Sequence, residues 1–306
     1  MRVAVTGASG LIGSALVPHL RSEGHEVVRM VRRPTTGPDE VHWDPDSGVV
    51  DLTGLEGTDA VVHLAAAGAG DHRWTEAYKA EFRDSRIRGT DTIARAMAQL
   101  DRPPQVLVSA SAIGYYGDTG DRAVDESAPA GRGFAAEVAV AWEAAADPAR
   151  GAGIRVVNPR TGLVVAGRRR IWGGGLWPTL SLSVLWPIVS LGVGGRLGSG
   201  RQWWSFISLR DEVRALTFLL ENLEGPVNLT APNPVTNAEF TRAMGSLLHR
   251  PTVLPVPPMV LKLALADFSS ELLGSIRALP TKLQDSGFAF QDPTVRDALA
   301  WAQSTR

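Results

Sequence analysis

Residues 6–13 read Thr6-Gly7-Ala8-Ser9-Gly10-Leu11-Ile12-Gly13, a T-G-x-x-G-x-x-G pattern that follows an apolar run at positions 3–5. Glycines at this spacing permit a tight turn, close approach of the backbone to a pyrophosphate, and close packing of a helix on a strand. The free N–H groups and the positive dipole end of the helix then hold the anion. The stretch therefore predicts a phosphate-binding turn for a dinucleotide, with contacts from Gly7, Ser9, Gly10, Leu11, Ile12 and Gly13.

The segments after this turn alternate between strand and helix patterns, which predicts a Rossmann-like α/β fold with a doubly wound parallel sheet. Strands are expected at residues 2–6, 26–31, 60–64, 106–109, 155–158 and 227–229, and helices at residues 11–22, 75–99, 135–146 and 211–222. The stretch around Trp43 and Asp44 reads as irregular, and the proline-rich last third predicts a smaller, mostly helical lobe. We expect a dinucleotide-binding domain at residues 1–166, to which 206–230 returns, and a substrate-binding lobe at 167–205 and 231–306.

The composition excludes several classes of site and partner. The 306-residue chain has a formal net charge of −1, which favours neither nucleic acid nor an anionic membrane as a partner. It has no cysteine, and its six histidines are never three or four residues apart, so disulfides, thiolate chemistry and a helical metal site are not expected. The strand directly after Met1 leaves no room for a signal peptide. These observations favour a cytoplasmic enzyme, monomeric or homodimeric, that acts on a small molecule.

One uncharged segment, residues 171–195, follows three arginines and superficially resembles a membrane span. Pro178, Pro187 and the glycines at 173–175 argue against a continuous spanning helix. Five of the nine tryptophans lie between residues 172 and 204, where their rings either line a site for a flat apolar ligand or pack the junction between lobes. We predict a tryptophan-bearing loop over a pocket.

The end of the second predicted strand indicates which dinucleotide binds. Enzymes that prefer NAD place an acidic residue there to accept a hydrogen bond from the adenosine 2′-hydroxyl, whereas this chain has Arg32 and Arg33 and no acid before Asp39. Arginine suits the 2′-phosphate of NADP, although both side chains can also be read as solvated surface charges. NADP is therefore the predicted cofactor.

Further cofactor contacts are expected at the ends of the next strands. Small residues after the third strand let the dinucleotide lie across the strand end, which places Leu64, Ala65 and Ala66 beside it. Ser109 ends the fourth strand, and Pro159 and Arg160 follow the fifth. Because the carboxyl ends of parallel strands meet at one edge of a sheet, these residues complete the expected site.

Several segments carry a resemblance to a known family. The opening turn, His63-Leu64-Ala65-Ala66, Val108-Ser109-Ala110-Ser111 and Tyr116-Gly117 resemble the extended short-chain dehydrogenase/reductase family. A narrower resemblance is to its atypical branch, usually labelled sugar-nucleotide epimerases, which has a characteristic C-terminal domain. That narrower match rests on Ser85-Arg86, Trp142-Glu143, Arg160-Thr161-Gly162, and the segments at 194–200, 236–240, 279–283 and 286–288.

The resemblance implies a catalytic serine or threonine with a Tyr-x-x-x-Lys array, in which the phenol exchanges the proton and the lysine lowers its pKa. None of the three tyrosines, at positions 78, 115 and 116, is followed by a lysine four residues later. Alignment on the helix before Trp142 places Phe134 at the tyrosine position and Val138 at the lysine position, and Arg86 replaces the family's asparagine. Every expected ionisable group except the serine is therefore missing.

Ser111 is the expected catalytic serine when residues are counted along the fourth strand, whereas counting backward from Tyr116 gives Ala112. We prefer the strand count, because a strand tolerates slippage less than the turn that follows it. Tyr115 and Tyr116 lie at the mouth of the expected pocket, where each either supplies a hydroxyl or simply packs. Glu143, on the altered helix, reads as a solvent-facing or structural charge.

Loss of the tyrosine and lysine should impair sugar epimerisation more than carbonyl reduction. A conjugated ketone, or one with a neighbouring hydroxyl, tolerates protonation by water or by an internal group, since hydride transfer depends first on proximity and orientation. Oxidation of a plain secondary alcohol during sugar epimerisation needs a real base. We therefore predict an NADPH-dependent reductase of a bulky, aromatic or polycyclic ketone. A nucleotide-sugar epimerase or dehydratase, and a catalytically silent NADP-binding protein, are the alternatives.

Overall fold

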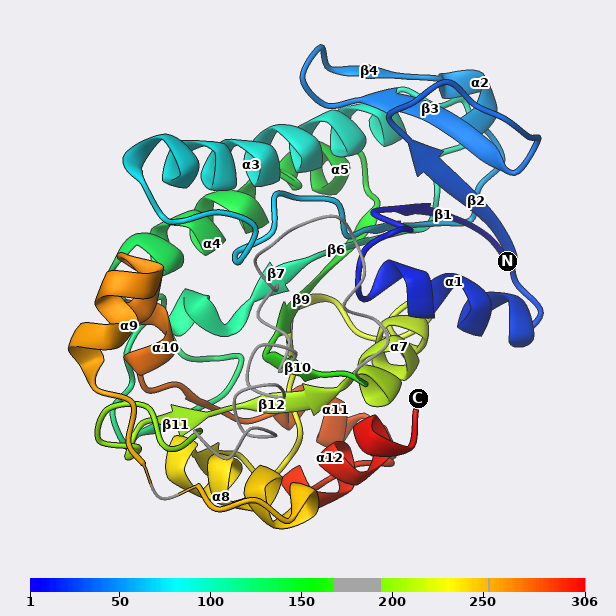
Figure 1. Ribbon diagram of the computed structural model, residues 1–306. Helices are drawn as coiled ribbons and strands as arrows, with labels where there is room; N and C mark the ends of the chain where they lie inside the picture. Colours follow the sequence, from blue (N-terminus) through cyan, green and yellow to red (C-terminus); the bar gives the residue numbers. More distant parts are fainter. Residues whose placement is uncertain (168–193, 253, 306) are drawn as a thin grey trace.

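The structure is a computed structural model that describes residues 1–167, 194–252 and 254–305 (Figure 1). Its main sheet has nine strands, in the order β13-β9-β6-β5-β1-β2-β3-β4, with β7 beside β9. All its pairings are parallel except that of β3 with β4. The strands are β1 (Arg2–Thr6), β2 (Glu26–Val31), β3 (Glu40–Asp44), β4 (Val49–Val50), β5 (Ala60–His63), β6 (Val106–Ser109), β7 (Ser111–Ala112), β9 (Arg155–Thr161) and β13 (Gly225–Leu229).

The strand order reverses direction between β1 and β5. From β1 the chain builds outward through β2 and β3, and it then returns to place β5 on the other side of β1. The connections that leave the carboxyl ends of β1 and β5 therefore run to opposite sides of the sheet. In open α/β sheets this point forms the crevice in which ligands bind.

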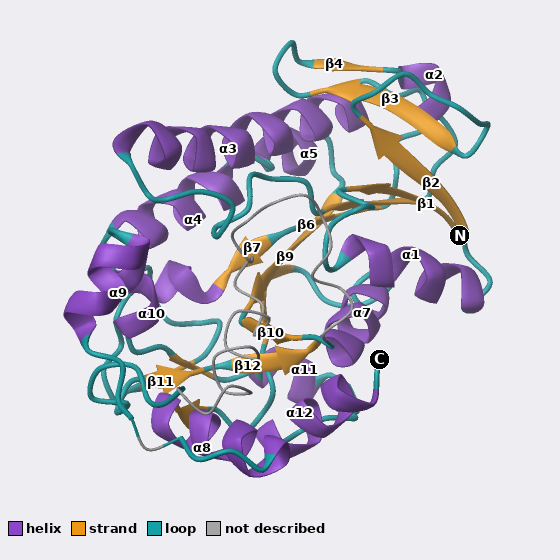
Figure 2. Ribbon diagram, viewed as in Figure 1, coloured by secondary structure: helices purple, strands orange, loops and turns teal. Residues whose placement is uncertain are grey.

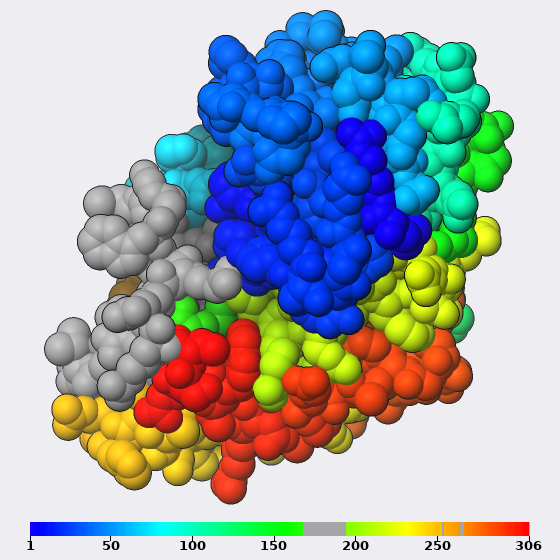
Figure 3. All heavy atoms as spheres, turned by 90° about the vertical axis from the view of Figure 1, so that its right-hand side faces the viewer, coloured from blue at the N-terminus to red at the C-terminus, as the bar shows by residue number. Residues whose placement is uncertain are grey.

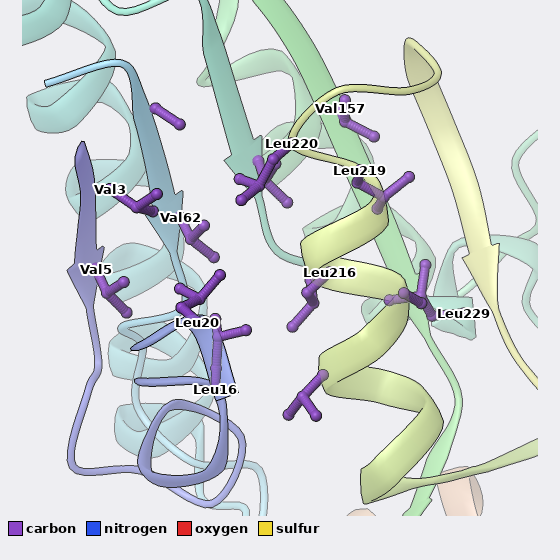
Figure 4. Packing of buried hydrophobic residues seen from close by; sticks show 14 of the residues in the cluster. Val3, Val5, Leu16, Leu20, Val62, Val157, Leu216, Leu219, Leu220 and Leu229 are labelled. Carbon is purple, nitrogen blue, oxygen red and sulfur yellow. The ribbon is translucent and has the colours of Figure 1, made fainter. Parts of the chain in front are cut away.

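Helices cover both faces of the sheet because its strands alternate their side chains between two apolar layers. Val3 and Val5 of β1 pack with Leu16, Leu20 and the helix α7 on one face (Figure 4), whereas the intervening Ala4 packs against the other face. The first face carries α1 (Gly13–Ser22) and α7 (Leu209–Phe218), and the second carries α3 (Glu76–Ala98) and α5 (Asp147–Gly151). α2 (Leu52–Leu55) and α4 (Phe134–Ala144) complete the helices of this part.

A second group of elements has its own core around Phe206, Phe240 and Met244. Its short strands pair as β10 (Leu163–Val165) with β12 (Phe206–Ser208), β11 (Trp203–Trp204) with β14 (Val235–Thr236), and β15 (Arg277–Ala278) with β8 (Ala123–Val124). Its helices are α8 (Asn237–Leu248), α9 (Pro258–Leu265), α10 (Phe268–Leu273), α11 (Thr281–Asp285) and α12 (Val295–Ser304), drawn with the strands in Figure 2. In the view of Figure 3 this group, coloured yellow to red, lies below the amino-terminal residues in blue.

The predicted fold class is confirmed, and several predicted strands match the structure residue for residue, namely β1, β2 and β6. Several predictions were wrong in detail: the stretch around Trp43 forms the strand β3, β9 continues three residues beyond its predicted end, and the helix predicted at 211–222 is α7, Leu209–Phe218. The loop predicted at 171–195 lies almost entirely outside the described residues. Within the described ranges, no helix is long and apolar enough to cross a membrane.

Candidate functional site

The turn between β1 and α1 has the geometry of a phosphate cradle. Gly7 adopts φ +65°, and a Cβ there would lie 2.9 Å from the backbone of residues 64 and 65. A Cβ on Gly13 would lie 2.2 Å from the Gly7 carbonyl oxygen, so only glycine fits at either position. α1 begins with no side-chain cap and no acidic residue in its first turn, so neither a capping side chain nor a negative charge competes with an anion at this end of the helix. These residues fit the pyrophosphate of a dinucleotide.

The hydroxyl of Thr6 ties this turn to the end of β5. It accepts hydrogen bonds from the backbone N–H groups of Leu64 and Ala65, at 3.0 and 3.2 Å, and lies 2.8 Å from Nδ1 of His63. Complete burial lowers the pKa of His63 to about 4, so its ring is neutral at physiological pH and Nδ1 can accept a hydrogen bond from the threonine hydroxyl. The strand ends predicted to lie beside the cofactor are thereby held together at the crevice.

The two arginines after β2 have different surroundings. Arg33 forms a two-pronged ion pair with Glu40, with N–O distances of 2.8 and 2.6 Å, which lowers the pKa of that carboxyl to about 2. Arg32 is exposed and has no ion pair or hydrogen bond with any residue in the described ranges. Arg32 is therefore the arginine that can bind a phosphate without first breaking an internal ion pair.

A cavity of about 220 Å³ lies at the same edge of the sheet as this crevice, between the sheet and the second group of elements. Residues at the ends of β7 and β9, including Ala112 and Thr161, form one side of it. Its lining is mostly apolar and contains six large aromatic rings: Trp74, Phe82, Trp142, Trp203, Trp204 and Phe268. Such a surface suits an apolar, ring-bearing molecule.

Two charged residues, Arg86 and Glu271, also line the cavity. Arg86, on α3, is 8% exposed, and burial lowers the pKa of its guanidinium to about 9. Burial raises the pKa of Glu271, on α10, which increases the fraction of protonated carboxyl near neutral pH. Among the described residues, the cavity therefore offers one cation, Arg86, and one carboxyl, Glu271, that can exist in its acid form.

Comparison with known proteins defines the family. Residues 3–230 match the model described as the NAD dependent epimerase/dehydratase family. The chain belongs to this family. Residues 256–302 match a domain of unknown function, DUF1731, which confirms the C-terminal domain expected of the narrower branch.

The relatives of this epimerase/dehydratase family member cover its whole length. An epimerase family protein of Mycobacterium tuberculosis is 47% identical over 303 residues, 98% of this chain and 97% of the relative. The crystal structure of the human epimerase family protein SDR39U1 with NADPH is 31% identical, with a TM-score of 0.86 and 100% of each chain covered. A nucleoside-diphosphate sugar epimerase from Corynebacterium glutamicum is 32% identical, with a TM-score of 0.77, and matches 100% of this chain and 59% of its own.

In this family member Ser111 and Ala112 face opposite ways, because neighbouring strand residues alternate. Ala112 lines the cavity, whereas Ser111 is buried and donates a 2.7 Å hydrogen bond to Oε1 of Glu143. Arg160 donates to the same carboxylate from Nε and Nη2, at 2.8 and 2.9 Å. The residue that lines the cavity is therefore Ala112, the position obtained by counting backward from Tyr116. Ser111 instead hydrogen-bonds to the internal ion pair of Glu143 with Arg160.

Both candidate tyrosines contact Arg160. The hydroxyl of Tyr116, which is 3% exposed, accepts from Nη1 of Arg160 at 3.0 Å and donates to Oδ1 of Asn228 at 2.8 Å. Tyr115 stacks its ring on the Arg160 guanidinium, with Cζ 3.3 Å from the ring centroid. The Tyr116 hydroxyl and the Arg160 side chain therefore have internal partners. Ser109, also expected at the cofactor, is fully buried.

Thr161 connects the cavity to a second buried acid. Its hydroxyl donates a 2.8 Å hydrogen bond to Oε1 of Glu212, which lies on α7 and has no solvent exposure. Oε2 of Glu212 has no partner among the described residues, and burial raises the pKa of the carboxyl to about 8. Glu212 is therefore predominantly a neutral acid at pH 7.

Sequence reasoning missed the importance of Arg86, Glu271 and Glu212. A signal for Arg86 was present, since Tyr78, Phe82 and Arg86 recur every four residues and so share the buried stripe of α3. Glu271 lies on a six-residue helix far along the chain and carries no such signal.

Proposed function

We propose that this chain is an NADPH-dependent oxidoreductase that reduces the carbonyl group of a bulky, apolar small molecule. The observation that carries the proposal is the aromatic cavity, which is lined by residues at the carboxyl ends of β7 and β9, on the same edge of the parallel sheet as the dinucleotide crevice. The human relative, whose structure contains NADPH, supports the choice of cofactor. A substrate among these rings would lie where the sheet edge presents the cofactor.

The cofactor residues follow from the crevice. The N–H groups at the start of α1 hold the pyrophosphate, and Leu64, Ala65 and Ala66 contact the dinucleotide as it crosses the end of β5. Arg32 binds the 2′-phosphate, because Arg33 is paired with Glu40. Pro159 at the end of β9 stays a predicted contact.

The proposed chemistry needs one proton from the protein. When bound, NADPH supplies the hydride that adds to the carbonyl carbon. The cavity rings orient the substrate and exclude water, and the carboxyl of Glu271 donates its proton to the carbonyl oxygen, so that the product is an alcohol. The resulting carboxylate regains its proton from solvent. Glu271 suits this role because burial raises the pKa of its carboxyl, which favours the acid form.

A nucleotide-sugar epimerase is the second candidate, because the Corynebacterium glutamicum relative is named as one. A nucleoside diphosphate requires several cationic or amide partners. In the described part of the cavity lining Arg86 is the one cation, and no asparagine or glutamine is present. The lining therefore favours the reductase.

The test measures NADPH oxidation by the full chain against aromatic and polycyclic ketones, with small aliphatic ketones for comparison and UDP-sugars in a separate epimerisation assay. The expected result is turnover of the bulky ketones, and Glu271→Gln should lower kcat by about 10²- to 10⁴-fold without changing the Kd for NADPH. Glu137→Gln, an exposed carboxyl on α4, is the control. Epimerised UDP-sugar would establish the second candidate, and tight NADPH binding without turnover would establish a silent binding protein.

A further inference from the structure

Arg86 is a buried cation without a carboxylate partner. Its Nη1 donates to the backbone carbonyl oxygens of Ala67 and Phe82, both at 2.9 Å. Its Cζ lies 3.4 Å from the ring centroid of Phe82 and 4.8 Å from that of Trp142. Across residues 1–167, 194–252 and 254–305 no carboxylate lies within ion-pair distance of it, and Nε and Nη2 make no hydrogen bond.

The unused N–H groups lie on one edge of the guanidinium. Nε and Nη2 together form the planar fork that binds both oxygens of a carboxylate. Desolvation penalises an unpaired guanidinium strongly, and the two carbonyls and two rings around Arg86 offset only part of that penalty. An anion with two coplanar oxygens would satisfy the open edge.

Arg86 itself lines the substrate cavity, together with the rings packed around it. Phe82, on which the guanidinium stacks, lies 5.2 Å from Trp74 by ring centroids, and Trp74 lies 5.1 Å from Phe268 of the carboxy-terminal elements. The phosphates of a dinucleotide already have partners in the turn at Gly7–Gly13 and in Arg32. Arg86 is therefore placed to recognise the molecule that lies among the rings.

We propose that the substrate is an oxo acid, with a ring-bearing apolar body and a carboxylate group that Arg86 binds through Nε and Nη2. This inference rests on the proposed reductase function and narrows its substrate class. It also gives Arg86, which stands at the position of the family's asparagine, a role in substrate selection.

Binding is tested by calorimetry with 2-naphthoate and its neutral amide, neither of which is reduced. The wild-type chain should bind the acid about 10- to 100-fold more tightly than the amide, as expected for charge-assisted hydrogen bonds. Arg86→Gln should abolish that preference, and Arg86→Lys, which keeps the charge but not the fork, should retain only part of it. Arg88→Gln is the matched control, because Arg88 is two residues along α3 on the opposite, exposed face and pairs with Asp84. If Arg86→Gln does not fold, the affinities of Arg86→Lys for the acid and the amide test the proposal instead.

Two results would overturn the inference. Equal affinity of the wild-type chain for the acid and the amide would show that the cavity has no carboxylate site. A weaker Kd for NADPH in Arg86→Gln, with the preference for acid over amide unchanged, would assign Arg86 to a cofactor phosphate instead. Neither readout depends on turnover, so failure to reduce any ketone would count against the proposed function alone.

Discussion

Replacing Glu212 by glutamine should remove a pH dependence from the stability of this protein. The Glu212 carboxyl is fully buried, accepts one hydrogen bond from Thr161, and has a pKa raised from 4.5 to about 8 by burial. The folded state therefore holds a proton that the unfolded chain releases above pH 4.5. The stability that the protonated Glu212 carboxyl contributes is fully present below pH 4.5 and is lost as the pH rises toward 8.

The magnitude follows from the size of this shift. Between pH 4.5 and 7 the wild-type chain should lose about 3 kcal/mol of unfolding free energy from this one group, at 1.36 kcal/mol per pH unit. That is a large part of the 5–15 kcal/mol typical of folded proteins. Urea unfolding at pH 5, 6, 7 and 8, followed by tryptophan fluorescence, measures it.

The contribution of Glu212 is separated from that of other groups by comparing how steeply the unfolding free energy falls with pH in the wild type and in two variants. Glu212→Gln should flatten the dependence over this pH range, because glutamine keeps the shape and the neutral charge of the protonated carboxyl. Glu221→Gln, just beyond the end of α7 and exposed, should leave the slope as in the wild type. Parallel slopes for Glu212→Gln and the wild type would show that Glu212 is ionised in the folded state, and the reasoning would be refuted.

Four further substitutions test the crevice and its support. Gly13→Ala places a Cβ 2.2 Å from a backbone oxygen and should cost about 1–3 kcal/mol of stability together with most of the NADPH affinity, both measurable by thermal shift with and without NADPH. Arg32→Ala should weaken NADPH binding by about 10- to 100-fold and leave NADH unchanged in fluorescence titrations, whereas Arg33→Ala should lower stability and keep the ratio of the two affinities. Equal effects of the two arginine substitutions on that ratio would contradict this assignment. Tyr116→Phe should cost about 1–3 kcal/mol in urea unfolding, because Nη1 of Arg160 and Oδ1 of Asn228 lose the hydroxyl to which they hydrogen-bond, with kcat unchanged. A large loss of kcat in that variant would restore Tyr116 as a catalytic residue.

The strands that the sequence predicts correctly are those whose environment is set locally. β1, β2 and β6 are apolar runs between turn residues, and burial on both faces needs no other information. β3 instead begins with Glu40, whose buried carboxylate is acceptable only because Arg29 and Arg33 neutralise it. Because that neutralisation depends on tertiary pairing, the polar residues of β3 read as irregular structure.

The candidate site likewise contains residues that the local sequence predicts and residues that only the tertiary structure brings together. The turn at Gly7–Gly13 is contiguous in sequence, and its spacing alone predicts the cradle. The choice between Ser111 and Ala112 depends on register, and a difference of one residue exchanges the side chain that faces the cavity for the one that faces away. Arg86 and Glu271 come from distant elements, so only the folded chain shows that they share a cavity.

The altered residues of α4 bear directly on catalysis. Val138 lines the cavity at the position of the family's lysine, and Phe134 packs 5.5 Å from Trp74 at the position of its tyrosine. These substitutions remove two ionisable groups and leave an apolar surface in their place. A low-dielectric surface strengthens the electrostatic effect of the charges that remain nearby. In the reaction we propose, the apolar residues at the positions of the usual dyad would therefore make the Arg86 guanidinium more effective in binding an anion and the Glu271 carboxyl more effective in donating a proton.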